Sequence, residues 1–210
     1  MVHDNTTQLV LQTIDVYERS AKECLARWSH RRHRRPPLLI EWLRCLPAEA
    51  RLLDLGCGGG RDAGDLAECG HCVVGVDRTS ALLSAARRRY RSLPLVRADL
   101  RDLPFQAMSF DGLWAAASLM HLPKSDARRV LSELRRLVRS GGFFAATVTH
   151  GMKSRLVTGG WLPGRYVARW KKDELARAVR RAGWTILELK VITNQERKGR
   201  WLNLLAQKQG

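Results

Sequence analysis

The chain lacks the long hydrophobic run that a membrane-spanning helix requires. Such a helix needs about 18 or more consecutive apolar residues, whereas the longest candidate, Gly112 to Leu122, is shorter and contains His121. The first residues, Met1 to Asn5, show no basic segment followed by an apolar one, so no secretory signal is apparent. We therefore expect a soluble, cytoplasmic protein with no membrane span.

Cysteines are few, and their spacing predicts no disulfide framework. The chain has five, an odd number, which is typical of a reducing compartment. Cys69 and Cys72 form a Cys-x-x-Cys sequence, but it follows a predicted helix, so no helix amino terminus lowers the pKa of the first thiol. No second such pair completes a four-ligand zinc site. We predict no metal site, and we expect Cys72 to be a buried strand residue.

Acidic residues are scarce relative to basic ones. The chain has 20 Asp and Glu against 37 Lys and Arg, a formal net charge of +17. A strongly basic chain can bind nucleic acid, because arginines neutralise phosphates. Most of these arginines, however, fall on the polar faces of amphipathic helices such as 124–140. Only His30 to Arg35 forms a compact basic run. Charge alone leaves a nucleic-acid partner open without favouring it.

The order of apolar segments predicts an α/β fold. The expected strands are apolar throughout, so both faces of the sheet should be covered by helices, as in a parallel sheet. A polar connection of hairpin type at 194–199 predicts that the last strand runs antiparallel. We therefore expect a doubly wound, Rossmann-like three-layer sandwich with a mixed seven-stranded sheet. The predicted strands are 51–55, 72–76, 95–98, 112–117, 143–148, 184–192 and 200–206, and the predicted helices between them are 61–68, 80–90, 125–139 and 171–182.

The residues before the first strand predict a helical cap. Residues 7–34 have the periodicity of one amphipathic helix, and 38–45 of a second, with Pro36 and Pro37 between them. No internal repeat or low-complexity tract divides the chain. We therefore assign residues 1–50 to an N-terminal helical cap that is part of the same domain as residues 51–210.

A glycine-rich loop follows the first predicted strand. It reads Asp-Leu-Gly-Cys-Gly-Gly-Gly-Arg from Asp54 to Arg61 and opens a predicted helix. Glycines let a ligand approach the main chain closely, and the start of a helix offers free amide donors to an anionic group. A dinucleotide fingerprint would need a third glycine where Arg61 stands. The loop therefore argues against NAD or FAD.

Acidic residues stand at the ends of the next two strands. Asp77 follows Asp54 by 23 residues, the length of one helix and one strand. A carboxylate at the tip of the second strand can accept hydrogen bonds from both hydroxyls of a ribose. Asp99 ends the third strand, and Gly141 and Gly142 form a turn into the fifth. These features occur in a fixed order over residues 51–148.

Together, this set of motifs resembles the class I S-adenosylmethionine-dependent methyltransferases. The closest likeness is to the small single-domain group, methyltransferase type 11/25-like, which is akin to ubiquinone-pathway and tellurite-type enzymes. The resemblance implies that residues 51–210 form a class I methyltransferase domain, with S-adenosylmethionine as cofactor and S-adenosylhomocysteine as product. It further implies transfer of the methyl group by direct in-line displacement. The cofactor-binding residues that it implies are Asp54, Gly56, Cys57, Gly58, Gly60, Asp77, Arg78, Asp99, Leu100, Ala116 and Ser118.

Candidates for the acceptor side follow from the ends of the fourth and fifth strands. His121, at the exit of the fourth, is our candidate general base for an acceptor that loses a proton early. His150, Trp161 and Tyr166 are predicted to line the acceptor pocket. The alternative for each of the four is a packing role.

Three hypotheses for the function remain open at the level of the sequence. We predict a small-molecule acceptor. The alternative is RNA (tRNA or rRNA) bound by the arginine-rich surface, although the chain shows no basic strand with interleaved aromatic residues of the kind found in RNA-recognition modules. A binding module without catalysis is the third, and the intact glycine loop favours it least. The sequence names neither the acceptor nor the oligomeric state.

Overall fold

The computed structural model describes residues 2–29, 35–194 and 199–210 of the 210-residue chain. All but the last residue of the basic run at His30 to Arg35 lies outside the described residues, as does the end of the helix expected over 7–34. The middle of the polar connection at 194–199 also lies outside them.

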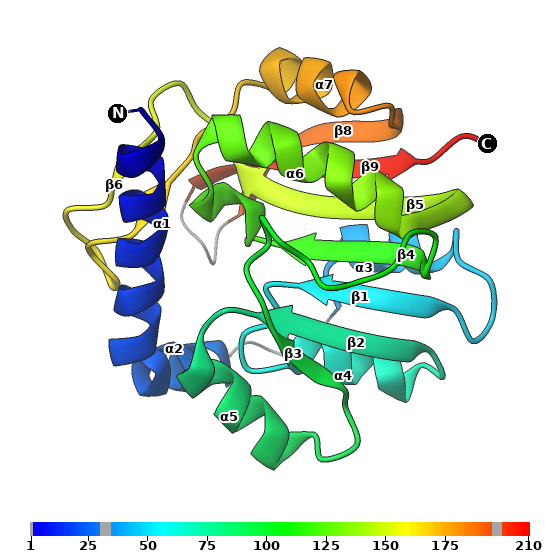
Figure 1. The fold of residues 1–210 in the computed structure, drawn as a ribbon, viewed down its shortest axis with the longest axis horizontal. Helices are drawn as coiled ribbons and strands as arrows, with labels where there is room; N and C mark the ends of the chain where they lie inside the picture. Colours follow the sequence, from blue (N-terminus) through cyan, green and yellow to red (C-terminus); the bar gives the residue numbers. More distant parts are fainter. Residues whose placement is uncertain (1, 30–34, 195–198) are drawn as a thin grey trace.

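A seven-stranded mixed sheet with the order β3-β2-β1-β4-β5-β9-β8 forms the centre of the fold (Figure 1). Neighbouring strands from β3 to β5 are parallel, whereas β9 is antiparallel to both β5 and β8. The expected doubly wound α/β fold with an antiparallel last strand is therefore confirmed. The strands are β1 (Arg51–Leu55), β2 (Cys72–Asp77), β3 (Leu95–Arg97), β4 (Phe110–Ala116), β5 (Val138–Thr149), β8 (Thr185–Asn194) and β9 (Gly199–Gln207).

Helices cover both faces of the sheet, which gives the three layers. Trp42 of α3 and the residues of α4 pack on one face with Trp114. On the other face, α6 and α7 pack against Phe144 and Trp184, and Figure 1 shows α6 in front of the sheet and α7 beside β8 at the top of the view. α5 packs against β2 and β3. The helices are α3 (Pro37–Leu43), α4 (Arg61–Glu68), α5 (Ser80–Arg89), α6 (Lys124–Leu137) and α7 (Lys172–Arg181).

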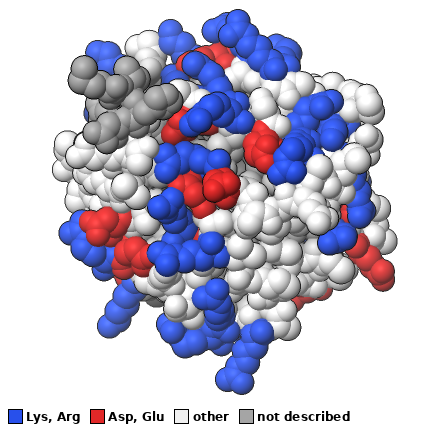
Figure 2. Space-filling view, in the orientation of Figure 1, with Lys and Arg blue, Asp and Glu red and all other residues white. Residues whose placement is uncertain are grey.

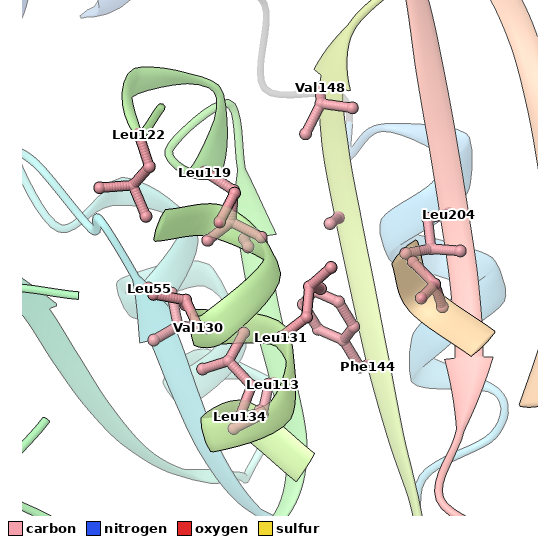
Figure 3. Packing of buried hydrophobic residues seen from close by; sticks show 14 of the residues in the cluster. Leu55, Leu113, Leu119, Leu122, Val130, Leu131, Leu134, Phe144, Val148 and Leu204 are labelled. Carbon is pink, nitrogen blue, oxygen red and sulfur yellow. The ribbon is translucent and has the colours of Figure 1, made fainter. Parts of the chain in front are cut away.

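The amphipathic pattern of α6 explains how this helix covers one face of the sheet. Its arginines point away from the sheet, and Figure 2 shows lysines and arginines spread over this side of the molecule with acidic residues between them. Its apolar residues Leu131 and Leu134 are buried in the cluster that holds Leu113 and Phe144 (Figure 3). Each buried leucine side chain stabilises the fold by about 1.5–3 kcal/mol.

The amino-terminal segment differs from the single helix predicted over 7–34. It forms two helices, α1 (Val2–Arg19) and α2 (Ala21–Ser29), with a turn at Ser20. The change of direction lets Val16 of α1 and Cys24 of α2 pack in one cluster with Leu82 and Leu162. Periodicity alone could not reveal this break, since the apolar positions of both helices keep the same spacing. Figure 1 shows α1 across the carboxyl ends of the parallel strands.

Three short elements near the same edge were not predicted. These are the 3-10 helix η1 (Leu119–His121) after β4, and the paired strands β6 (Arg155–Leu156) and β7 (Tyr166–Val167). Cys72 begins β2 but is exposed, contrary to the expectation that it is buried. Within the described ranges, no helix is both long and apolar enough to cross a membrane. No cluster of three or more metal-ligating side chains occurs in that part of the chain.

Candidate active site

A cavity of about 750 Å³ opens at the carboxyl ends of the parallel strands. Such a position, where strands of an open α/β sheet end, is where ligands bind in doubly wound folds. Gly60, His150 and Tyr166 are absent from its described lining. The predicted site residues that line it are Asp54, Gly56, Cys57, Gly58, Asp77, Arg78, Asp99, Leu100, Ala116, Ser118, His121 and Trp161.

The glycine loop is fixed against the ends of β2 and β4. The N–H groups of Gly56 and Cys57 donate to the Val76 carbonyl at 2.7 and 2.9 Å. Gly56 has φ +75°, and a Cβ there would lie 2.4 Å from the Cβ of Ser118. Gly60 instead caps α4 and packs against Ala86 of α5. Glycine at 56 is therefore required by both the turn and the close approach.

Asp77 presents a half-buried carboxylate to the cavity. Its Oδ2 accepts a hydrogen bond from the Gly58 N–H at 2.9 Å, and its Oδ1 accepts one from the Thr79 N–H at 2.8 Å. Burial raises the pKa of Asp77, while these amide bonds act to lower it. Each carboxylate oxygen accepts about two hydrogen bonds, so both oxygens retain capacity for a ligand.

Two oxygen atoms on the cavity wall have no hydrogen-bond partner among the described residues. They are Oδ2 of Asp54 and Oγ of Ser118, both buried. Burial raises the pKa of Asp54 well above its usual range, and the charges of Asp62 and Asp77 add to this effect. An unsatisfied buried polar atom is costly, so these oxygens are suited to a ligand that donates hydrogen bonds.

Asp99 is held by two arginines instead of standing free. Arg78 pairs with its Oδ2, and Arg101 contacts both of its oxygens at 2.8 and 3.1 Å. Burial would raise the pKa of Asp99, but the hydrogen bonds and charges of Arg101 and Arg78 outweigh it and lower that pKa. A ligand group near Asp99 therefore meets a carboxylate already fixed in position.

The predicted helical cap, formed by α1 and α2, roofs the glycine loop through contacts that the sequence did not specify. Trp28 lies 3.3 Å from a Cβ placed on Gly58, and Leu25 lies 2.4 Å from one placed on Gly59. Glu18 accepts hydrogen bonds from the N–H groups of Ser80 and Ala81, at 2.6 and 2.9 Å, where α5 begins. The apolar stripe of the predicted helix over 7–34 was the signal for this roof, since it needed a surface to cover.

Further along the cavity, His121 belongs to a partly buried hydrogen-bond network. Its Nδ1 lies 2.8 Å from the Tyr166 carbonyl oxygen. Because a carbonyl only accepts, Nδ1 carries the proton and Nε2 is the acceptor. The Tyr17 hydroxyl donates to Nε2 at 2.9 Å, and Arg165 donates to the Tyr17 oxygen at 3.1 Å. Tyr166 thus contributes its carbonyl to the network, although it is not among the lining residues.

Burial sets the charge state of this network. It lowers the pKa of His121 to about 4, with the charge of Arg165 adding to the shift and the Tyr166 carbonyl opposing it. Burial likewise raises the pKa of Tyr17. At neutral pH the imidazole is therefore neutral and the phenol protonated. His150 lies apart, its N–H bonded to the Arg200 carbonyl and its pKa lowered by burial and by the charge of Arg200.

Sequence comparison agrees with the fold. A family model described as "Methyltransferase domain" matches residues 53–146, from β1 into β5. With its seven-stranded sheet and glycine loop, the matched region is a methyltransferase domain with the class I, S-adenosylmethionine-dependent fold. More narrowly, residues 53–146 match the type 11 methyltransferase domain.

Two known proteins show the range of this similarity in sequence. Methyltransferase GfsG of Streptomyces halstedii is 34% identical over 160 residues, which cover 70% of this chain and 57% of that protein. The tRNA (carboxymethyluridine(34)-5-O)-methyltransferase ALKBH8 of Mus musculus is 28% identical over 160 residues, covering 74% of this chain and 23% of that protein. The chain spans between 31% and 57% of the length of the first curated relatives it matches.

A solved structure is similar over nearly the whole chain. It is the Burkholderia thailandensis 1,6-didemethyltoxoflavin-N1-methyltransferase, with 1,6-didemethyltoxoflavin and S-adenosylhomocysteine bound. The TM-score is 0.79, the identity 22%, and the match covers 98% of this chain and 91% of that one. At this identity the likeness shows the fold.

The cavity wall fits S-adenosylmethionine in its chemistry. The methionine end of this cofactor carries an ammonium group, which donates hydrogen bonds. Such a donor would supply the missing partner of the Asp54 and Ser118 oxygens. Its ribose carries two hydroxyls, which the spare acceptor capacity of Asp77 suits. The donors and acceptors present on this wall are therefore complementary to the cofactor of the family.

Proposed function

We propose that the protein transfers the methyl group of S-adenosylmethionine to a small-molecule acceptor. The observation that carries this proposal is the roofed cavity of about 750 Å³, in which Asp54 and Asp77 share one space with the Tyr17–His121 network. That volume lies within the range of about 300–1,000 Å³ typical of small-molecule sites. Since α1 and α2 lie over the glycine loop, a long polynucleotide would have to displace them or enter by its end.

We propose that the cofactor is bound by the residues inferred from the sequence, and that these residues have different roles in binding it. Asp77 would bind the ribose, and Asp54 and Ser118 the methionine ammonium, while Gly60 acts through the shape of the loop. We also propose that residues 1–50 act as a cap within one domain with residues 51–210. The remaining members of the cofactor set are Gly56, Cys57, Gly58, Arg78, Asp99, Leu100 and Ala116.

The chemistry requires alignment more than acid–base catalysis. The bound cofactor supplies a methyl group activated by a sulfonium. The chain's own residues hold the acceptor in line at about 3–3.5 Å, and such positioning accounts for about 7–11 kcal/mol of barrier lowering. Because Nε2 of His121 faces Tyr17, a proton reaching the predicted base would pass through the Tyr17 hydroxyl. Trp161 lines the cavity and would contact the acceptor.

The alternative acceptor is RNA, which the ALKBH8 match and the net charge of +17 favour. Against it, the basic side chains in Figure 2 are spread among acidic ones instead of forming one stripe. We further propose a cytoplasmic location, supported by five free cysteines.

Methyl incorporation from radiolabelled S-adenosylmethionine distinguishes the two acceptors. The purified protein is incubated separately with a small-molecule extract and with total RNA, and Asp77→Asn serves as a cofactor-site control. We expect label in the small-molecule fraction that depends on Asp77. Label in RNA alone would contradict the proposal and establish the alternative.

A further inference from the structure

Charge is divided unevenly along the cavity wall. Its four acidic residues, Asp54, Asp62, Asp77 and Asp99, all lie where β1, β2 and β3 end or at the start of α4. On that cofactor side, Arg61 is paired with Asp62 and Arg78 with Asp99, and the exposed Arg89 of α5 also lines the cavity. The acceptor side carries further arginines and no acid. These acceptor-side arginines are Arg27, Arg165, Arg169 and Arg200.

Arg165 keeps an uncompensated charge although it is well positioned. Its Nε donates to the Leu162 carbonyl at 2.9 Å and its Nη1 to the Tyr17 hydroxyl at 3.1 Å. The guanidinium also lies over the rings of Tyr17 and Trp161, 5.7 and 5.0 Å from their centroids. All of these partners are neutral, and no ion pair is formed by Arg165 within the described residues. The remaining N–H groups of its five are available to a ligand.

Arg169 provides a second unsatisfied donor on the same wall. Its Nε is buried and has no hydrogen-bond partner among the described residues. The side chain lies against Gly151, where a Cβ would come within 3.1 Å of the Arg169 Cδ. This glycine therefore leaves room for the arginine beside the cavity. A buried donor without a partner is costly unless a ligand supplies the acceptor.

The surroundings of these arginines are apolar. Val10 and Ile14 of α1, Val157, Trp161 and Val167 line the cavity around them. A ligand that fits this wall needs an apolar body and a negatively charged group. A carboxylate or phosphate suits the group, because guanidinium binds both through paired, charge-assisted hydrogen bonds.

We infer that the methyl acceptor is a small molecule with an apolar body and an oxyanion, carboxylate or phosphate, bound by Arg165 and Arg169. This inference rests on the proposed small-molecule methyltransferase function. Arg165 is the main contact, since its neutral partners fix the guanidinium without neutralising it. The oxyanion restores charge balance at a cationic wall and places the acceptor beside Tyr17 and Trp161.

Calorimetric titration of the full chain saturated with S-adenosylhomocysteine tests the inference. The probes are benzoate and phenyl phosphate, with benzamide as the neutral analogue of similar shape. Arg165→Gln and Arg169→Gln remove the proposed contacts, and Arg165→Lys keeps the charge. Arg180→Gln is the matched control, because Arg180 is exposed on α7 and lines no part of the cavity.

We expect at least one anion to bind about tenfold or more tightly than benzamide, and Arg165→Gln to weaken it by about tenfold or more, as for a charged hydrogen bond. A smaller loss is expected for Arg169→Gln, partial retention for Arg165→Lys, and no change for Arg180→Gln. Affinity for S-adenosylhomocysteine should stay constant in all four variants, which shows that they fold. The preferred probe identifies the oxyanion.

Two results would overturn the inference: benzamide binding as tightly as both anions, or no anion binding that depends on Arg165. If labelled methyl still enters the small-molecule fraction, the proposed function survives and only the anionic acceptor is wrong. Label entering RNA alone, with anion binding lost to added RNA, would overturn both.

Discussion

At the scale of single residues, burial controls the charge of the side chains that face the cavity. The pKa values of the buried Asp54 and the half-buried Asp77 are raised, and that of the half-buried His121 is lowered. In each case burial disfavours the charged form. At neutral pH His121 is therefore uncharged, and ligand contacts to Asp54 and Asp77 act on groups whose charged form burial disfavours.

Asp77→Asn should weaken binding of S-adenosylhomocysteine. The substitution keeps the size of the side chain but removes the charge and one acceptor oxygen beside Gly58 and Thr79. The expected loss is about 1.5–3 kcal/mol, the range for hydrogen bonds to a charged group, measured by calorimetry. Asp173→Asn, on the exposed start of α7, is the control. Equal affinities of the two variants would exclude Asp77 as a ribose contact.

His121 should make stability depend on pH in a defined window. Its pKa is about 4 in the folded chain and about 6.5 in an unfolded one. Between these pH values the unfolded state binds more protons than the folded state. The contribution of neutral His121 to the free energy of unfolding is therefore fully present above about pH 6.5 and is lost as pH falls toward 4. The loss reaches about 3 kcal/mol at the low end.

The matched variant for this test is His121→Gln, which cannot be protonated. Asp54 and Asp77 shift stability in the opposite direction over part of the same window, because their raised pKa values favour proton binding by the folded state. The quantity to measure is therefore the difference between wild type and variant in urea unfolding at pH 7.5 and pH 5. A difference that does not change with pH would show that His121 is not buried in its neutral form.

Residue roles differed in how far the sequence could predict them. The sequence could place Asp54, Gly56 and Asp77 at the cavity wall because their motif is local and sits between a strand and a helix. Tyr17 and Arg165 were missed: they lie 148 positions apart, and their contact exists only because α1 crosses the end of the sheet. No spacing rule relates such positions.

At the scale of elements, the glycine loop is the most constrained turn near the site. Gly56→Ala adds a Cβ that would clash with Ser118, at a residue with φ +75°. Gly70→Ala is the control, since Gly70 has φ +87° but nothing within 4 Å of the added atom. Backbone strain of about 1–3 kcal/mol applies to both. We expect Gly56→Ala to lose more unfolding free energy than Gly70→Ala, and also cofactor affinity; equal losses would show that Ser118 yields freely.

The contact between α1 and α5 should govern how firmly the roof closes. Glu18 places a carboxylate at the amino terminus of α5, where free N–H groups and the helix dipole favour an anion. Glu18→Gln should cost about 0.5–2 kcal/mol, as for loss of a helix cap. Hydrogen exchange in α1 and α2 should become faster while that of β1 and β4 stays unchanged. Glu23→Gln, on the exposed side of α2, is the control. Identical exchange rates in both variants would show that the Glu18 contact does not hold α1 and α2 in place.

The elements themselves were predicted best where two signals coincided. Strand β1 and helix α4 have the predicted bounds, because a short apolar run and a glycine turn mark both. Helix 7–34 was wrong as one unit, since the turn at Ser20 follows from packing of α1 and α2 on the same cluster. Strands β6 and β7 have two residues each, too few for any periodicity.

At the scale of the whole molecule, an excess of positive charge should oppose folding. The chain carries +17, and like charges brought together in a compact state repel one another. Raising KCl from about 0.01 M to about 0.1 M shortens the screening length from about 30 Å to about 10 Å. Since this weakens repulsion between distant arginines, the thermal unfolding midpoint should rise. For a chain of this size, each kcal/mol gained corresponds to about 2–4 °C.

A variant with fewer positive charges separates repulsion from specific ion binding. Arg88, Arg91, Arg177 and Arg180 are exposed, and replacing all four by Gln lowers the net charge from +17 to +13. The midpoint of this variant at low salt should lie above that of the wild type, and its rise with KCl should be smaller. Surface ion pairs act in the other direction, because salt weakens them too. A midpoint that falls with salt would therefore mean that attraction, as in the Arg139–Asp111 pair, outweighs the repulsion expected from the net charge.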